Sequence, residues 1–319
     1  MKVLANDGIS QTGIDALTNA GFNVNTTKVA QEQLAKYINE NSIDVVLVRS
    51  ATTVRKDVID ACPNLKIIGR GGVGLDNIDV DYAKEKGIHV INTPAASSHS
   101  VAELVFAHFF GLARFLHNAN RDMPLDGDTR FKDLKKAYAK GVELKGKTLG
   151  IIGFGRIGQA TAKMAIGLGM NVIAYDPFIE NVNLQLSFFD GRTLDFEINT
   201  ISKEDVLKQS DFISLHVPAQ KEYVIGQKEL EVMKDGVILA NAARGGVIDE
   251  VALIQSINSG TGKVAKAALD VFENEPKPEV QLLMNPELSL SPHIGAATQE
   301  AQDRIGTELA EQIIAILKS

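Results

Sequence analysis

Residues 148–158, TLGIIGFGRIG, decide the fold of this 319-residue chain. The stretch opens with an apolar run typical of a buried strand. It continues into a G-x-G-x-x-G pattern at Gly153, Gly155 and Gly158, and a helical pattern then runs to Leu168. A strand, a glycine-rich turn and a helix in that order are the fingerprint of a dinucleotide-binding fold. The sequence therefore predicts a site where a pyrophosphate lies at a helix N-terminus, with room made by the glycines.

The next strand-like run, 171–176, points to the identity of the dinucleotide. It ends in Asp176, and an acidic side chain at this place accepts hydrogen bonds from the ribose hydroxyls and repels the extra phosphate of NADP. We therefore expect NAD as the cofactor. The alternative is an ordinary α/β domain with a glycine-rich turn.

On both sides of this stretch, short β-branched runs alternate with helical patterns along most of the chain. This alternation predicts an α/β fold with parallel sheets, and two such sheets follow each other in the sequence. A long helix is expected over about 97–118, a polar, Lys-rich connector over 120–147, and an amphipathic helix over 299–318. The strand-like runs are 2–6, 44–50, 65–70 and 89–93, then 148–152, 171–176, 212–216, 237–241 and 264–271.

Composition and charge exclude several classes of protein. The chain is 45% hydrophobic and 23% charged, which excludes a disordered or low-complexity protein. Its net charge of −7 argues against a general nucleic-acid or anionic-membrane binder. No apolar run reaches the roughly 18 residues of a membrane span, and the N-terminus lacks a signal-peptide core, so a cytoplasmic protein is expected. The single cysteine, Cys62, is expected to be a buried apolar residue.

Three polar residues after strand-like runs form a candidate catalytic set: Arg244, Glu275 and His293. Each alone has a simpler explanation, as a surface turn residue, a solvated loop charge or a structural histidine. Together with a nicotinamide cofactor they suit oxidation of a 2-hydroxy acid. Arginine binds a carboxylate bidentately, histidine is a base near neutral pH, and a carboxylate beside the histidine orients it.

The strings GFGRIG, ARGGVIDE, ALDVFENEP and SPHIGAAT, in this order, resemble the D-isomer-specific 2-hydroxyacid dehydrogenase family. The resemblance implies a Rossmann-type doubly wound nucleotide domain, residues 97–294, inserted in a smaller flavodoxin-like α/β substrate domain, residues 1–96 plus 295–319. It also implies a homodimer held by an arm at about 120–142. The basic residues of this arm, Arg130, Lys132, Lys135 and Lys136, would reach the neighbouring subunit's site or form a solvated basic face.

The resemblance also implies roles for single residues. Arg244 would bind the substrate carboxylate and carbonyl, His293 would be the acid/base, Glu275 its partner, and Asp270 would face the nicotinamide carboxamide. No metal is implied. The expected cofactor-binding set is Val73, Gly153, Gly155, Arg156, Ile157, Gly158, Asp176, Pro177, His216, Val217, Pro218, Ala242, Ala243, Arg244, Asp270, His293, Gly295 and Ala296.

VRSATTV at 48–54 and IIGRGGVGLDNID at 67–79 resemble the branch of the family that acts on 3-phosphoglycerate. Arg49 and Arg70 both end apolar runs, so both could point into one interdomain cleft and neutralise a phosphomonoester. Structural ion pairs with acidic neighbours are the alternative for these arginines. The expected substrate-binding set is Arg49, Ser50, Arg70, Gly71, Gly72 and Arg244.

The expected reaction is therefore NAD-dependent oxidation of 3-phospho-D-glycerate to 3-phosphohydroxypyruvate, the first step of phosphorylated serine biosynthesis. The sequence ends at Ser319 without a C-terminal regulatory domain, so feedback by serine through such a domain is not expected. A glyoxylate/hydroxypyruvate or D-lactate-type reductase is the near alternative. A non-catalytic, NAD-sensing protein is an alternative of another class, but such a protein need not keep Arg244, Glu275 and His293.

Overall fold

The computed structural model describes residues 1–318, and this part of the chain folds into two compact units. Unit 2 is Val101–Gly295, and unit 1 combines residues 1–100 with the described residues from Ala296 onward. The chain therefore crosses between the units twice. Residue 319, the last of the expected substrate domain, lies outside the described residues.

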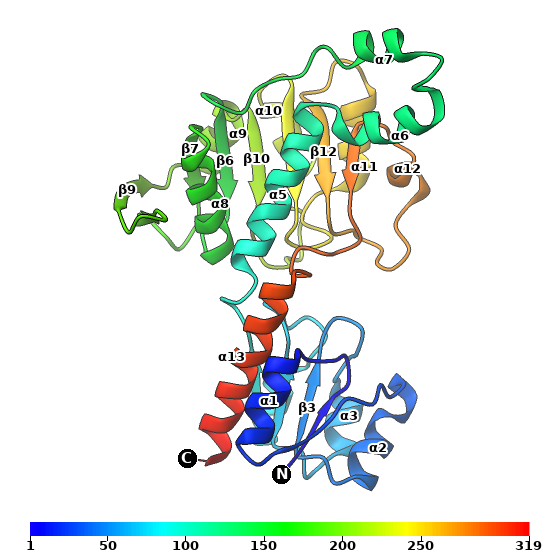
Figure 1. The fold of residues 1–319 in the computed structure, drawn as a ribbon, viewed down its shortest axis with the longest axis vertical. Coiled ribbons are helices and arrows are strands. Elements are labelled where there is room, and N and C mark those ends of the chain that lie inside the picture. Colours follow the sequence, from blue (N-terminus) through cyan, green and yellow to red (C-terminus); the bar gives the residue numbers. More distant parts are fainter. Residues whose placement is uncertain (319) are drawn as a thin grey trace. The chain divides into compact units, whose positions relative to one another are not determined.

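Unit 1, which contains the elements labelled α1, β3 and α13 in Figure 1, is built on a five-stranded parallel sheet. The strand order is β2-β1-β3-β4-β5, the order of flavodoxin-like folds. The sequence analysis missed its short edge strand, β2. The strands are β1 (Lys2–Ala5), β2 (Asn23–Asn25), β3 (Val45–Val48), β4 (Ile67–Arg70) and β5 (His89–Asn92). The helices are α1 (Gln11–Asn19), η1 (Gln31–Gln33), α2 (Leu34–Glu40), α3 (Lys56–Ala61), α4 (Val80–Glu85) and α13 (Gln299–Lys318).

Helices cover both faces of the unit 1 sheet, and successive strand residues point to opposite faces. Val46 and Val48 pack with α2, α3 and α4, and this core also contains the fully buried Cys62. Val45 and Leu47 pack with α1 and with Leu309 of α13. The last helix of the chain thus completes the core that the first helix begins.

Unit 2 is built on a six-stranded sheet with the order β13-β12-β11-β10-β6-β7, in which all neighbours are parallel. The strands are β6 (Thr148–Ile152), β7 (Asn171–Tyr175), β10 (Phe212–Leu215), β11 (Val237–Asn241), β12 (Val264–Leu269) and β13 (Leu288–Leu290). The helices that follow strands are α8 (Arg156–Gly167), α9 (Lys203–Gln209), α10 (Gln227–Val232), α11 (Glu250–Asn258) and α12 (Val280–Leu283).

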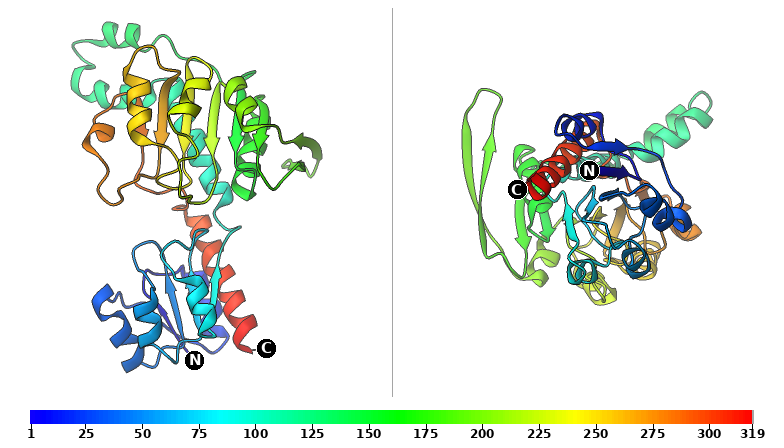
Figure 2. Two further views of the ribbon diagram at one scale, coloured as in Figure 1. Left: turned by 180° about the vertical axis from the view of Figure 1, so that it is seen from behind. Right: turned by 90° about the horizontal axis from the view of Figure 1, so that it is seen from below.

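Helices cover both faces of this sheet (Figure 2), and a hydrophobic core lies on each face. One core packs α8 and α5 (Ser98–Ala113) on Leu149 and Ile151. The other packs α9, α10 and α11 on Ile152, Leu239 and other strand residues. Because all six strands are parallel, their carboxyl ends lie at one edge of the sheet, where open α/β sheets bind their ligands.

The helix expected over 97–118 is interrupted. It ends at Ala113, because Phe115 adopts a left-handed backbone with φ of 56°, and α6 (Leu116–Asp126) and α7 (Phe131–Ala137) follow. The ring of Phe115 is stacked with Tyr138, and the ammonium of Lys266 lies 3.3 Å from its centroid. The connector expected over 120–147 is thus partly helical.

A hairpin that the sequence analysis did not predict extends the β7 edge of unit 2. It consists of β8 (Asn181–Ser187) and β9 (Thr193–Asn199), which pair antiparallel. Leu184 is buried in the core beneath α8, whereas Phe189 at the tip is fully exposed. The strands of the hairpin therefore pack on unit 2, whereas its tip is exposed.

Candidate active site

The three glycines of the turn after β6 meet different surroundings. Gly153 has a φ of 92°, and a Cβ there would lie 2.5 Å from the carbonyl oxygen of His216. A Cβ on Gly158 would lie 2.2 Å from the carbonyl oxygen of Gly153. At Gly155 nothing lies within 4 Å of an added Cβ. Two glycines are thus required by packing, and the third borders open space at the helix N-terminus, as a cradle for a pyrophosphate requires.

Asp176, at the end of β7, is bonded to the same turn. Its Oδ2 accepts the backbone N–H of Phe154 at 2.7 Å and its Oδ1 accepts that of Phe178 at 2.9 Å. A carboxylate has about four acceptor positions, so two remain for ribose hydroxyls. No side chain caps the N-terminus of α8, which leaves its first N–H groups for an anion.

His216 follows β10 beside the glycine-rich turn. Its Nε2 lies 2.8 Å from Ser214 Oγ and 3.1 Å from Thr161 Oγ1, and burial lowers the pKa of the imidazole to about 3. Its Nδ1 is buried, and no residue of the described chain bonds it. A buried ring nitrogen without a partner is costly, so a polar group of a bound cofactor fits this place.

Arg244 is held by a compact loop at the end of β11. Asn241 at the strand end accepts the N–H of Ala243 at 3.0 Å and donates its amide to the Arg244 carbonyl at 2.9 Å. A Cβ on the neighbouring Gly245 would lie 1.9 Å from the carbonyl oxygen of Phe272. Only glycine allows this approach, which brings the Arg244 loop against the loop that carries Glu275.

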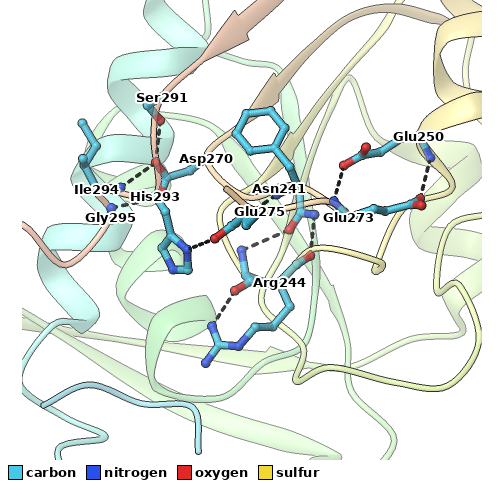
Figure 3. A network of polar contacts seen from close by, with 12 residues as sticks. Asn241, Arg244, Glu250, Asp270, Glu273, Glu275, Ser291, His293, Ile294 and Gly295 are labelled. Carbon is cyan, nitrogen blue, oxygen red and sulfur yellow. Dashed lines mark hydrogen bonds and ion pairs between the residues drawn. The ribbon is translucent and has the colours of Figure 1, made fainter. Parts of the chain in front are cut away.

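Glu275 and His293 form a direct pair, shown with the nearby Arg244 in Figure 3. Glu275 Oε2 lies 2.8 Å from His293 Nδ1, and Glu275 Oε1 accepts the N–H of Phe272 at 3.1 Å. The carboxylate accepts a hydrogen bond from Nδ1–H, so Nε2 of the neutral imidazole is the basic nitrogen. A cavity of about 400 Å³ lies against the pair, and its walls include Leu283 and Leu290.

Asp270 lies behind His293 and is 1% exposed. Its carboxylate accepts the Ser291 hydroxyl at 2.6 Å and the N–H groups of Ile294 and Gly295, each at 2.8 Å. In the structure this side chain holds the 293–295 backbone.

The arginines expected to bind substrate phosphate lie at neighbouring strand ends of unit 1. Arg70 ends β4 and is paired with Val48 of β3, which Arg49 follows directly. The two side chains flank a glycine pair: a Cβ on Gly72 would lie 2.2 Å from Arg70 Nη1, and one on Gly71 would lie 3.6 Å from Arg49 Cγ.

A cavity of about 350 Å³ opens at the ends of β1 and β3, and Lys28, Arg49 and Ser50 line it. Asp7 also lines it, and its oxygens accept the N–H of Arg49 at 2.6 Å and the hydroxyl of Thr52 at 2.7 Å. Within residues 1–318, no carboxylate forms an ion pair with the Arg49 or Lys28 side chain. The sequence analysis missed Lys28, because an isolated lysine after a short strand carries no motif.

The structure divides the expected site residues between the units. Arg49, Ser50, Arg70, Gly71, Gly72, Val73 and Ala296 lie in unit 1. All other expected site residues lie in unit 2: Gly153, Gly155, Arg156, Ile157, Gly158, Asp176, Pro177, His216, Val217, Pro218, Ala242, Ala243, Arg244, Asp270, Glu275, His293 and Gly295.

Residues 1–318 contain neither a cluster of metal-binding side chains nor a helix that could span a membrane. In residues 1–318 no three His, Cys, Asp or Glu side chains gather as a metal site would require. No helix in the same range combines the length and the apolar character needed to cross a membrane.

The fold and the site define the class of the protein, an oxidoreductase with a nicotinamide cofactor. The glycine-rich turn lies at an uncapped helix of a six-stranded parallel sheet, and the His–Glu pair lies at the strand ends. Residues 106–295 match the family described as D-isomer specific 2-hydroxyacid dehydrogenase, NAD binding domain. The chain belongs to the D-isomer specific 2-hydroxyacid dehydrogenase family, and its cofactor is NAD.

Individual relatives differ in their activities. The chain is 45% identical to a hydroxypyruvate reductase of Thermotoga maritima over 98% of its own length and 97% of that protein. It is 42% identical to the D-3-phosphoglycerate dehydrogenase of Methanocaldococcus jannaschii over all of its own length but only 58% of that protein. Its fold matches the D-lactate dehydrogenase of Aquifex aeolicus, crystallised with NAD and lactic acid, with a TM-score of 0.75 and 30% identity over 100% of this chain and 96% of that one.

Proposed function

We propose that the protein oxidises 3-phospho-D-glycerate to 3-phosphohydroxypyruvate with NAD, and so catalyses the first step of phosphorylated serine biosynthesis. The observation that carries this proposal is the unit 1 cavity lined by Arg49 and Lys28. Two cations without an ion-pair partner suit a phosphomonoester dianion, which an unphosphorylated acid lacks.

The proton chemistry belongs to His293 and Glu275. With Nδ1–H donated to Glu275, the free Nε2 accepts the proton of the C2 hydroxyl as the alcohol is oxidised. The Glu275 carboxylate holds the ring in this tautomer and stabilises the imidazolium that forms. Its own Oε1 is fixed by the N–H of Phe272, so the pair is oriented before substrate binds.

Substrate orientation belongs to Arg244. Its guanidinium binds the carboxylate of the hydroxy acid in a fork, and the Asn241 bonds fix the loop that carries it. Bound NAD would supply the acceptor for the hydride that leaves C2. Gly155 and the N–H groups of α8 would bind the pyrophosphate, and the two remaining acceptor positions of Asp176 would bind the ribose hydroxyls.

Reduction of hydroxypyruvate is a second candidate activity. The observation that favours it is the reductase of Thermotoga maritima, which matches the chain over nearly the whole length of both proteins. The two candidates share the unit 2 chemistry and differ in what unit 1 must bind.

A comparison of substrates separates the two candidates. We expect kcat/KM for 3-phosphoglycerate to exceed that for D-glycerate by at least about 100-fold, since hydrogen bonds to charged groups contribute roughly 1.5–3 kcal/mol each. The reverse reaction should show the same preference for phosphohydroxypyruvate over hydroxypyruvate. Equal values for both pairs would contradict the proposal, and a preference for hydroxypyruvate would establish the second candidate.

Substitutions in unit 1 test the phosphate contacts directly. Arg49→Met and Lys28→Met should each raise KM for 3-phosphoglycerate roughly 10- to 100-fold and leave KM for D-glycerate nearly unchanged. Lys36→Met is the matched control, because Lys36 is exposed on α2 and pairs only with Glu40. Equal losses on both substrates would show that these residues do not bind phosphate.

Substitution of His293 separates an enzyme from a non-catalytic NAD-binding protein. His293→Ala should lower kcat by at least about 100-fold with little change in NAD affinity, because general acid–base catalysis typically contributes that much. Glu275→Gln should lower kcat less, since an amide still bonds to Nδ1. An unchanged rate in His293→Ala would refute the acid/base role.

A further inference from the structure

A buried histidine that the proposed reaction does not use lies beside the candidate site. His108, in the middle of α5, is 9% exposed and stands between two serines of the β13 region. Its Nδ1 lies 2.7 Å from Ser289 Oγ and its Nε2 lies 2.9 Å from Ser291 Oγ. Both ring nitrogens are therefore engaged by hydroxyl groups.

The hydrogen bonds of this cluster run in one direction. Ser291 has a single hydroxyl proton, and it donates this proton to Asp270 Oδ1 at 2.6 Å. Ser291 Oγ must therefore accept from His108, so Nε2 carries the ring proton. In a neutral imidazole the other nitrogen, Nδ1, is then an acceptor, and it accepts a hydrogen bond from the Ser289 hydroxyl. This hydrogen-bond chain runs from Ser289 through His108 and Ser291 to Asp270.

Asp270, the end of this chain, fixes the segment that carries His293 (Figure 3). Its carboxylate accepts the N–H groups of Ile294 and Gly295, and its backbone carbonyl accepts that of His293 at 2.8 Å. His293 has a φ of 54°, in the left-handed region that residues other than glycine seldom adopt. Such a backbone persists only where its surroundings hold it.

We propose that His108 is a positioning residue for the reaction: through Ser291 it fixes the Asp270 carboxylate, and through Asp270 it fixes the backbone that presents His293. The proposal rests on the proposed acid/base role of His293. The hydrogen bonds of the His108 ring go to Ser289 and Ser291, and not to Arg244, Glu275 or His293. Its Nε2–H donates a hydrogen bond to Ser291 Oγ, and the Ser291 hydroxyl therefore points to Asp270.

The direction of the chain has a test that does not depend on activity. The ¹⁵N spectrum of imidazole-labelled protein should show His108 as a neutral ring with its proton on Nε2, assigned by the signal that disappears in His108→Leu. A proton on Nδ1 would reverse the direction of the hydrogen bonds at His108 and overturn the proposal.

Kinetics test the positioning role. His108→Leu should lower kcat/KM about tenfold on both 3-phosphoglycerate and D-glycerate, and should raise the primary deuterium isotope effect of the C2-deuterated substrate, because a misplaced base slows the chemical step. His108→Gln carries both a donor and an acceptor and should recover most of the rate. Ser291→Ala breaks the chain next to Asp270 and should reproduce the loss.

Leu112→Ala, a fully buried change on the same helix, is the control for destabilisation. It should lower the melting temperature but leave the isotope effect and the kcat/KM per active site unchanged. Parent values in His108→Leu, or equal changes in Leu112→Ala, would overturn the proposal. If the parent protein oxidises neither substrate, the proposed function fails, whereas the ¹⁵N result still decides the direction of the chain.

Discussion

At the scale of single residues, the glycine-rich turn separates packing from binding. Gly158 has no room for a methyl group, whereas Gly155 has open space and an ordinary φ of −71°. We expect Gly158→Ala to lower the melting temperature by several degrees. Gly155→Ala should fold like the parent and bind NAD at least about tenfold more weakly, as measured by fluorescence titration of NADH. Equal NAD affinity in Gly155→Ala and the parent would contradict the placement of the pyrophosphate.

Glu250 is a buried carboxyl at the start of α11. It exchanges hydrogen bonds with Glu273: Glu250 Oε1 accepts the N–H of Glu273 at 2.8 Å, and Glu273 Oε1 accepts the N–H of Glu250 at 3.1 Å. Burial raises the pKa of Glu250 to about 7, and nearby Glu273, Glu279 and Glu275 add to the rise. The exchange fastens the loop before Glu275 to the helix. The N–H of Glu273 favours the ionised carboxylate of Glu250, but burial and the neighbouring carboxylates outweigh this bond.

Glu250 should therefore make stability depend on pH. A raised pKa in the folded protein gives a contribution that is fully present below about pH 4.5 and is lost as the pH rises through 7, up to about 3 kcal/mol. Glu250→Gln keeps the acceptor oxygen and should be more stable than the parent at pH 8 but not at pH 4.5, by urea denaturation. Glu231→Gln, on the exposed surface of α10, is the control, and an equal gain there would refute the explanation.

How well single residues could be predicted depended on whether they belong to a motif. Glycine spacing and strand-end positions pointed to Gly153, Asp176 and His293, because the roles of these residues require particular neighbours in the sequence. Lys28 and His108 could not be found in this way. Their surroundings come from segments far apart in the chain, and in sequence His108 is only a polar residue on an apolar helix.

At the scale of elements, the arm of unit 2 has apolar side chains that no other part of the described chain buries. Leu125 is 75% exposed and Phe131 is 57% exposed, and α6 has no buried residue. Family resemblance implies a dimer through about residues 120–142. Exposed apolar residues on a helical arm suit a contact with a second copy.

We expect the parent protein to be a dimer and the double variant Leu125→Glu/Phe131→Glu to be a monomer with unchanged helix content. Sedimentation velocity measures the first property and circular dichroism the second. Phe189→Glu, at the tip of the hairpin, should remain a dimer although Phe189 is fully exposed. A parent monomer, or a dimer in the double variant, would show that the arm does not form the interface.

Elements were predicted best where apolar periodicity was long. The helix expected over 299–318 is α13 with the same bounds, and all five strands expected in unit 2 are present, whereas the short β13 was missed. The break at Phe115 was missed, because a left-handed residue held by Tyr138 and Lys266 leaves no local signal. β8 and β9 were missed although Asp190-Gly191 is a turn signal, because strands in such a fold are expected to alternate with helices.

At the scale of the whole molecule, α13 belongs to unit 1. The strands of this unit end at Asn92, about 200 residues before α13 begins at Gln299. It packs on α1, where a Cβ on Gly13 would lie 2.8 Å from Gly306 Cα, and Thr12 donates its hydroxyl to Asp303 at 3.1 Å. Ile305, Leu309 and Ile313 are buried in the same core. Removal of this helix would expose the part of this sheet face that α1 does not cover.

A chain that stops after Gly295 should therefore lose unit 1 and keep unit 2. We expect proteases to digest residues 1–100 while unit 2 resists and still binds NADH, as followed by mass spectrometry and fluorescence. Leu309→Ala in the full chain is the graded control and should destabilise unit 1 by about 2–5 kcal/mol. Protection of unit 1 in the shortened chain would show that α13 is dispensable.

The two crossings between the units also set an order of events during synthesis. At about 5–20 residues per second, roughly 15 to 60 s separate the synthesis of α1 from that of α13. Throughout this interval the sheet face that holds Val45 and Leu47 has only part of its cover. The unit that begins at the N-terminus is therefore the last to be completed, and unit 2, encoded between its two parts, is able to fold first.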